Sequence, residues 1–181
     1  MEETENQELV LNRLRNFDVG LFIKREDKIH PQISGNKYRK LKYNIAAALA
    51  ENKKTLLSFG GAFSNHISAV AAVGKMHNLK TIGIIRGDEL GANPDDSIRA
   101  NPTLKLAEFN GMRFKFVSRT DYRLKKEAFF IEQLKDEFGD FYLIPEGGTN
   151  ALAIKGCEEI LKAKDQNFDF ICAAMGTGGT L

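Results

Sequence analysis

The stretch TLLSFGGAFSNHISAVAAVGKMH, residues 55–77, decides the fold class. Thr55–Phe59 is mostly apolar and predicts a buried strand, and the two glycines after it predict a sharp turn. Ser64 to His77 is rich in Ala and Val and predicts a helix. A strand followed by a turn and a helix of ten or more residues is the unit of parallel sheets with helices on their faces.

The same alternation continues on both sides of this stretch. Further strands are predicted at 20–23, 81–85, 113–117, 141–144 and 168–174, and further helices at 36–51, 102–109, 121–138 and 151–163. Only the polar segment Arg86–Asn101 breaks the rhythm, and its length is typical of a functional or mobile loop. We therefore expect an α/β protein with open, twisted parallel sheets and helices on both faces, in which ligands bind at the carboxyl ends of the strands.

Composition excludes several classes of protein. The chain has 181 residues, with 26 Lys and Arg against 24 Asp and Glu, so its net charge of +2 gives no reason to expect a nucleic-acid or membrane partner. The two cysteines, Cys157 and Cys172, have no neighbours at metal-ligand spacing, and no metal is expected. The acidic start does not resemble a secretory leader, so we expect reduced thiols and a cytoplasmic location.

The first candidate site is the basic cluster Ser34-Gly35-Asn36-Lys37-Tyr38-Arg39-Lys40. Ser34 and Asn36 are plausible helix N-caps, which puts three cations in a first turn where they oppose the helix dipole and one another. Such crowding lowers the pKa of a lysine, and a neutral amine is what a Schiff base requires. The cations could also attract a phosphate. The competing interpretation is a solvated basic helix start.

The second candidate site is the turn Gly60-Gly61-Ala62-Phe63-Ser64-Asn65-His66. Ser64 would lie near the N-cap, so a carboxylate or phosphate could rest on the free N–H groups of the helix. Asn65 and His66 offer side-chain hydrogen bonds at the same place. An ordinary strand–helix turn, with His66 as a satisfied polar residue, is the competing interpretation.

The third candidate site is the loop Gly176-Thr177-Gly178-Gly179-Thr180, whose N–H groups and hydroxyls would form an anion nest. It has neither the Walker pattern nor dinucleotide spacing, and a tight turn is the alternative. A similar turn at 145–150 is read as structural, with Asn150 as a helix cap. Ser58 and both cysteines lack a visible partner for a hydrolase triad. Because the chain stops directly after a glycine-rich turn, we expect the C-terminal part of the fold to be missing.

Together these residues resemble the family of 1-aminocyclopropane-1-carboxylate deaminase and D-cysteine desulfhydrase, pyridoxal-phosphate enzymes with the tryptophan-synthase-like fold. The resemblance runs from Lys24-Arg25-Glu26-Asp27 to the end of the chain. Its most specific part is Ser34 to Leu41, SGNKYRKL, joined in order by Ser64-Asn65-His66, Gly147-Gly148 and the terminal glycine loop.

The resemblance implies a role for each site residue. Lys37 would hold pyridoxal 5'-phosphate covalently and move the substrate α-proton, and Asn65 would bind the cofactor ring oxygen. Ser64 would lie by the substrate carboxylate and take part in proton transfer, with Asn65 and His66 also contacting substrate. The phosphate would be held by Gly176, Thr177, Gly178, Gly179 and Thr180. The resemblance also implies a smaller domain at 45–148, a larger one from 1–44 and 149 onward, and a homodimer.

His66 stands where the deaminase branch tends to have Gln, so the resemblance favours the desulfhydrase: elimination from D-cysteine to pyruvate, ammonia and hydrogen sulfide. The cyclopropane deaminase is the alternative, and a dehydratase or racemase of the same fold group is another. Two rivals come from other classes: a non-catalytic pyridoxal-phosphate-binding protein and a nucleotide-binding α/β domain. The chain alone is expected to be poorly soluble and inactive.

Overall fold

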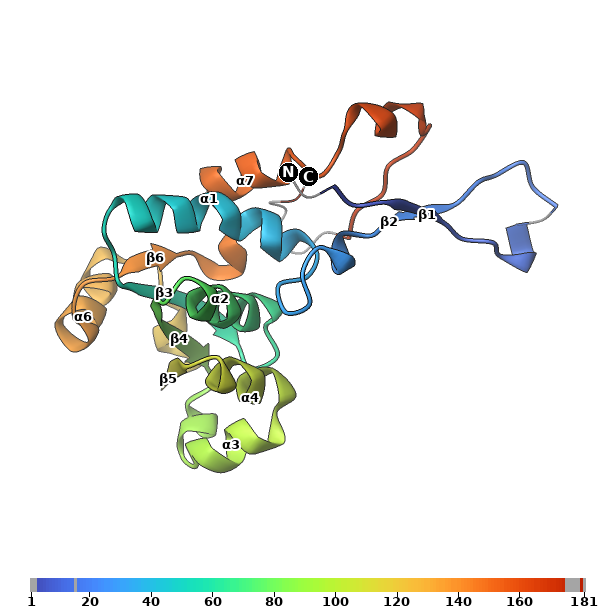
Figure 1. Ribbon diagram of the computed structural model, residues 1–181. Helices are drawn as coiled ribbons and strands as arrows, with labels where there is room; N and C mark the ends of the chain where they lie inside the picture. The colour runs from blue at the N-terminus through green and yellow to red at the C-terminus, as the bar shows by residue number, and fades with distance from the viewer. Residues whose placement is uncertain (1–2, 15, 175–179, 181) are drawn as a thin grey trace.

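The computed structural model describes residues 3–14, 16–174 and 180. Its core is a four-stranded parallel sheet in the order β5-β4-β3-β6 (Figure 1). The strands are β3 (Thr55–Gly61), β4 (Lys80–Arg86), β5 (Met112–Val117) and β6 (Tyr142–Ile144). All three neighbouring pairs are parallel, so the carboxyl ends of the strands lie along one edge.

Alternate side chains of β3 divide the core into two clusters. Leu56 packs in the cluster formed with α1 (Asn36–Ala50), α2 (Asn65–Met76) and α4 (Pro102–Phe109). Leu57 and Phe59 point the other way, toward Phe130 and Leu134 of α6 (Ala128–Phe138). Because strand side chains alternate with period two, one strand supplies both faces. The predicted α/β class, with a parallel sheet covered on both faces, is confirmed.

The remaining elements surround this core. They are β1 (Asn6–Glu8), β2 (Phe22–Lys24), α3 (Pro94–Ala100), α5 (Arg119–Arg123), α7 (Ala151–Cys157) and five short 3-10 turns at 12–14, 26–28, 88–91, 146–148 and 163–167. β1 and β2 pair antiparallel and project away from the sheet (Figure 1). In the described residues, no helix is long and apolar enough to cross a membrane.

Two predicted helices differ from those observed. The helix predicted at 121–138 is interrupted before α6, where Glu127 takes an extended backbone, and the break lets both Tyr122 and Phe130 reach the second core cluster. The helix predicted at 151–163 ends at Cys157, because the chain turns there and brings Glu159 back to Arg39.

The polar segment Arg86–Asn101 was expected to be a loop, but it contains α3, which begins with Pro94 in its first turn. Proline suits that position because its fixed φ is helical and its missing N–H has no partner there anyway.

The strand predicted at 168–174 is absent. No described strand pairs with it; the Phe168 ring packs against that of Phe22 at 5.1 Å, and Phe170 is 88% exposed. The strand predicted at 20–23 is observed at Phe22–Lys24, as the antiparallel β2. All four strands of the parallel sheet lie between residues 55 and 144, and the division into domains at 45–148 stays a prediction.

Helix α7 packs directly on α1. A Cβ built on Gly156 would lie 2.0 Å from the carbonyl oxygen of Arg39, so only glycine allows this approach. Beyond α7, Asp165 is buried and accepts hydrogen bonds from Lys24 and Asn6, both at 2.7 Å. Burial acts to raise the pKa of Asp165, but these bonds and the N–H of Lys162 outweigh it and lower the pKa to about 2.

We predict that Gly156→Ala destabilises the protein, because the added methyl forces α7 away from α1. The expected loss is about 1–3 kcal/mol in the free energy of unfolding, measured by urea denaturation. Glu158→Ala, at an exposed position just past the same helix, is the control and should change stability by less than about 0.5 kcal/mol. Equal stability of G156A and the native chain would contradict the close contact.

Candidate active site

Lys37 lies in the first turn of α1, two residues after Gly35, whose backbone conformation suits glycine. Gly35 is the N-cap residue, with φ of 62°. The predicted caps, Ser34 and Asn36, are therefore wrong: Asn36 is already the first helical residue. The ammonium of Lys37 donates to the carbonyl oxygen of Gly147 at 3.3 Å. The turn before α7 thus holds the lysine side chain in place.

Burial of the Lys37 side chain lowers its pKa, and the neighbouring ammonium of Lys40 lowers it further. A thiolate at Cys157 acts in the opposite direction. Both main causes disfavour the charged form, so the neutral amine needed for carbonyl chemistry is more populated than on an exposed lysine.

Lys40 and Cys157 complete a polar group around Lys37. The ammonium of Lys40 lies 3.3 Å from the hydroxyl of Thr149, and burial lowers the pKa of Lys40 as well. Cys157 is buried, and burial raises the pKa of its thiol, although both lysines act against that. Sequence reasoning assigned Cys157 no role because it shows no metal-ligand spacing and no partner for nucleophilic catalysis; the contact of α7 with α1 brings the thiol near Lys37 and Lys40.

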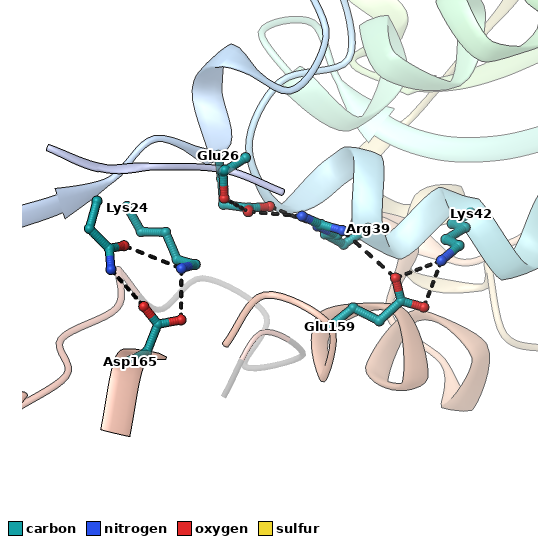
Figure 2. Close-up of polar contacts among 8 residues, drawn as sticks. Lys24, Glu26, Arg39, Lys42, Glu159 and Asp165 are labelled. Atoms are coloured by element: carbon teal, nitrogen blue, oxygen red, sulfur yellow. Dashed lines mark hydrogen bonds and ion pairs between the residues drawn. The ribbon is translucent and has the colours of Figure 1, made fainter. Parts of the chain in front are cut away.

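Arg39 does not belong to this group, contrary to the prediction that three cations crowd together. Its side chain is 2% exposed and forms hydrogen bonds with both carboxylate oxygens of Glu26, at 2.9 and 3.1 Å. It also lies 3.7 Å from Glu159, which pairs with Lys42 at 2.6 Å (Figure 2). The charge of Arg39 is therefore compensated on the side of α1 that faces α7.

The turn between β3 and α2 has the geometry that the sequence predicts. The hydroxyl of Ser64 caps α2 by accepting from the N–H of Ile67 at 3.4 Å. A Cβ on Gly60 would lie 2.4 Å from the Ile67 side chain and 2.9 Å from Ser64 Oγ, so the turn requires glycine there. Asn65, the first residue of α2, is exposed, and Ser64 is half-buried. Both are available at the N-terminus of a twelve-residue helix.

His66 is buried beneath this turn, with 2% of its surface exposed. Its Nε2 lies 2.8 Å from the hydroxyl of Ser58, which donates to the carbonyl of Ile144, also at 2.8 Å. Since the single hydroxyl proton is used, Nε2 carries the ring proton. Among the described residues Nδ1 has no hydrogen-bond partner. Ser58 therefore does have a histidine partner, which sequence reasoning missed, but at 0% exposure it is no nucleophile for a substrate.

Burial is also the main reason that the pKa of His66 falls to about 3, with contributions from the charges of Lys37 and Lys40. The Pro145 carbonyl opposes the shift. The ring is neutral throughout the physiological range. The predicted contact of His66 with substrate stays a prediction, and His66 points into the core rather than toward solvent.

Of the terminal glycine loop, Gly176, Thr177, Gly178 and Gly179 lie outside the described residues. Thr180 is described, and its hydroxyl accepts from the side-chain amide of Asn36 at 2.7 Å. The same hydroxyl acts to lower the pKa of the Cys157 thiol, against the larger effect of burial. Thr180 thus contacts the residue that precedes Lys37.

We predict that Lys40→Gln raises the pKa of Lys37 toward that of an ordinary lysine, because it removes a neighbouring positive charge. The rate of arylation of Lys37 by fluorodinitrobenzene, followed by mass spectrometry as a function of pH, should shift to higher pH. Lys42→Gln is the matched control on the same helix, since Lys42 pairs with Glu159 and should leave the profile unchanged. An unaltered profile in K40Q would exclude this coupling.

We also predict that His66 makes stability depend on pH. Its pKa is lowered on folding, so between about pH 6.5 and 3 the unfolded chain binds a proton that the folded chain does not. The contribution of His66 to the free energy of unfolding is therefore fully retained above pH 6.5. It decreases as pH falls below 6.5, by at most about 1.4 kcal/mol per pH unit. His66→Gln should flatten the curve obtained by urea denaturation, and His77→Gln, at an exposed position, should not.

A parallel measurement on the native chain covers the case in which H66Q does not fold. The ring-proton resonance of His66 should not move between pH 8 and 5. A titration of that resonance near pH 6.5 would contradict the buried neutral ring.

The chain is similar to known proteins along almost its whole length. A family model described as pyridoxal-phosphate dependent enzyme matches residues 6–181. A Thermotoga maritima protein, provisionally named 1-aminocyclopropane-1-carboxylate deaminase, is 34% identical over 94% of this chain and 55% of its own. An Arabidopsis thaliana protein, named as a mitochondrial bifunctional D-cysteine desulfhydrase/1-aminocyclopropane-1-carboxylate deaminase, is 34% identical over 89% of this chain and 43% of its own. The chain therefore spans about half the length of these relatives.

Solved structures give the same result. The crystal structure of a homologue of 1-aminocyclopropane-1-carboxylate deaminase superposes with a TM-score of 0.77 at 28% identity, over 99% of this chain and 54% of its own. A hydrogen sulfide-producing enzyme from Fusobacterium nucleatum superposes with a TM-score of 0.61 at 19% identity, over 89% of this chain and 47% of its own, and shows the shared fold alone. With a half-buried lysine of lowered pKa at the start of a helix and a family model matched along almost its whole length, this chain belongs to the family of pyridoxal-phosphate dependent enzymes.

Proposed function

We propose that Lys37 is the residue that binds pyridoxal 5'-phosphate, and that the whole protein is a lyase or deaminase of small amino acids. The observation that carries this proposal is the environment of Lys37: a half-buried amine of lowered pKa, held at the Gly147 carbonyl. The residues around it fit the cofactor. Lys40 supplies a second buried cation, and Thr180 and Asn36 supply a hydroxyl and an amide beside it.

The cofactor, when bound, withdraws electrons from the α-carbon of an amino acid and so makes the α-proton removable. In the proposed mechanism the amine of Lys37 takes that proton, and Lys40 favours the neutral form of Lys37 that can do so. The free N–H groups at the N-terminus of α2 would bind the substrate carboxylate beside Ser64. Asn65, exposed at the same end, would contact the cofactor ring oxygen.

Among the reactions open to such a site, we infer β-elimination from D-cysteine, which with one water gives pyruvate, ammonia and hydrogen sulfide. The name of the Arabidopsis relative, which pairs both activities, supports this choice and also keeps the cyclopropane deaminase as the second candidate, with 2-oxobutanoate and ammonia as products. Because His66 is buried against Ser58, its influence on the choice would act through the shape of the turn.

A cytoplasmic location is part of the proposal. It is supported by the two cysteines, Cys157 and Cys172, which are both free thiols. The homodimer stays a prediction. A non-catalytic pyridoxal-phosphate-binding protein is the rival of another class, and it would bind the cofactor without exchanging the substrate α-proton.

The test is reductive labelling followed by a substrate panel. The protein, expressed at the full length of its gene, is incubated with pyridoxal phosphate and reduced with borohydride, and we expect the label on Lys37. D-Cysteine should be turned over faster than the cyclopropane acid, and Lys37→Ala should lower the rate by about 10³-fold or more. Lys126→Ala, at an exposed lysine, is the control.

Each outcome has one meaning. A label elsewhere in a folded protein would refute the role of Lys37. Faster turnover of the cyclopropane acid would replace the desulfhydrase by the deaminase. Labelling of Lys37 without exchange of the α-proton for deuterium in any amino acid of the panel would favour the non-catalytic rival.

A further inference from the structure

A cleft of about 950 Å³ lies along the carboxyl edge of the parallel sheet. Gly61, Arg86 and Val117 end their strands in register with one another, and the first two line the cleft. This edge is where open parallel sheets bind ligands, and the volume is that of a small-molecule site. The cleft also begins next to the candidate active site: Phe63, which precedes Ser64, lines it, and so does Glu146, which precedes Gly147.

Within the described part of the chain, some charged side chains of the cleft form ion pairs and others do not. Its carboxylates are all engaged: Glu89 pairs with Arg119 at 3.5 Å, Asp96 with Arg99 at 3.8 Å, and Glu146 with Lys125 at 3.4 Å.

Two further cations line the same cleft, Arg86 and Arg123. Neither has an ion-pair partner among the residues for which the structure gives a position. Guanidinium groups have forked donors that match carboxylates and phosphates, so two of them left over in one cleft indicate an anionic ligand.

Arg86 is held in position before any ligand arrives. Its guanidinium lies over the ring of Tyr122, 5.6 Å from the centroid, a cation–π contact. Tyr122 is itself 3% exposed, and its hydroxyl donates to Glu146 at 2.8 Å. Its ring also packs edge-on against Phe59 of β3 at 6.1 Å. A donor fixed by a buried aromatic ring loses little freedom on binding, which favours affinity.

We propose that this cleft binds an anionic group, a carboxylate or a phosphate, of a small molecule, with Arg86 as the principal donor and Arg123 as the second. The site is additional to the residues around Lys37 and goes beyond the proposed function. Phe63, 78% exposed at the rim, offers an apolar surface to the remainder of the molecule.

The test is calorimetric titration of the protein, expressed at the full length of its gene, with two probes, succinate and inorganic phosphate, at low ionic strength. We expect at least one probe to bind, and Arg86→Gln to weaken that binding about tenfold or more, with a smaller loss for Arg123→Gln. Arg113→Gln is the matched control, because Arg113 lies outside the cleft, over the ring of Phe138. A preference for succinate would assign the site to carboxylates, and a preference for phosphate to phosphoryl groups.

Two outcomes would overturn the proposal: no binding of either probe to the native full-length protein, or equal binding to native and R86Q protein. A third separates this site from the cofactor site. R86Q should still be labelled on Lys37 by pyridoxal phosphate and borohydride; loss of the label in a variant with native thermal unfolding would assign the cleft to the cofactor instead. Absence of the label in the folded native full-length protein would refute the function of Lys37 but leave anion binding intact.

Discussion

The buried ion pair between Arg39 and Glu26 is the interaction on which the arrangement around Lys37 depends. Arg39 is two residues beyond Lys37 on α1, and Glu26 belongs to the turn after β2. Glu26 also accepts from the hydroxyl of Thr4, and Arg39 approaches Glu159 after α7. A buried charge whose partner is removed costs about 3–5 kcal/mol, so three segments far apart in sequence are tied to one guanidinium.

This constraint explains how a helix start with three cations is tolerated. One cation is neutralised in the core, and the two that remain, Lys37 and Lys40, are both buried enough for their pKa values to fall. The repulsion between these two ammonium groups therefore contributes to the lowered pKa of Lys37. The backbone of the same Arg39 packs against Gly156, so the ion pair and this close packing hold the same part of α1 in place.

Local patterns predicted the central part of the fold well. The apolar run at 55–59 and the Ala- and Val-rich run after it correspond to β3 and α2, because a strand buried on both faces and a buried helix leave strong signals. The strand expected at 168–174 is not observed, because apolar residues form a strand only when a neighbouring strand supplies backbone hydrogen-bond partners. The break before α6 was not predicted, because it depends on where Tyr122 and Phe130 pack, and that packing is a property of the tertiary structure. In the candidate site, motifs in the sequence indicated Lys37 and the Ser64–Asn65 turn. The contact of His66 with Ser58 and the approach of Cys157 to Lys37 could not be predicted, because they join residues on different elements that only the tertiary fold brings together.

The contacts of Asp165 have a consequence for synthesis on the ribosome. Asp165 binds Lys24 and Asn6, partners 141 and 159 positions earlier in the chain. Thr180 reaches Asn36 across 144 positions. A growing chain can pair β3 with β4 as soon as that segment emerges, but Asn6, Lys24 and Asn36 must wait for Asp165 and Thr180. Closure of such long loops is slow, so the nascent lysine pocket stays open while the sheet behind it is already formed.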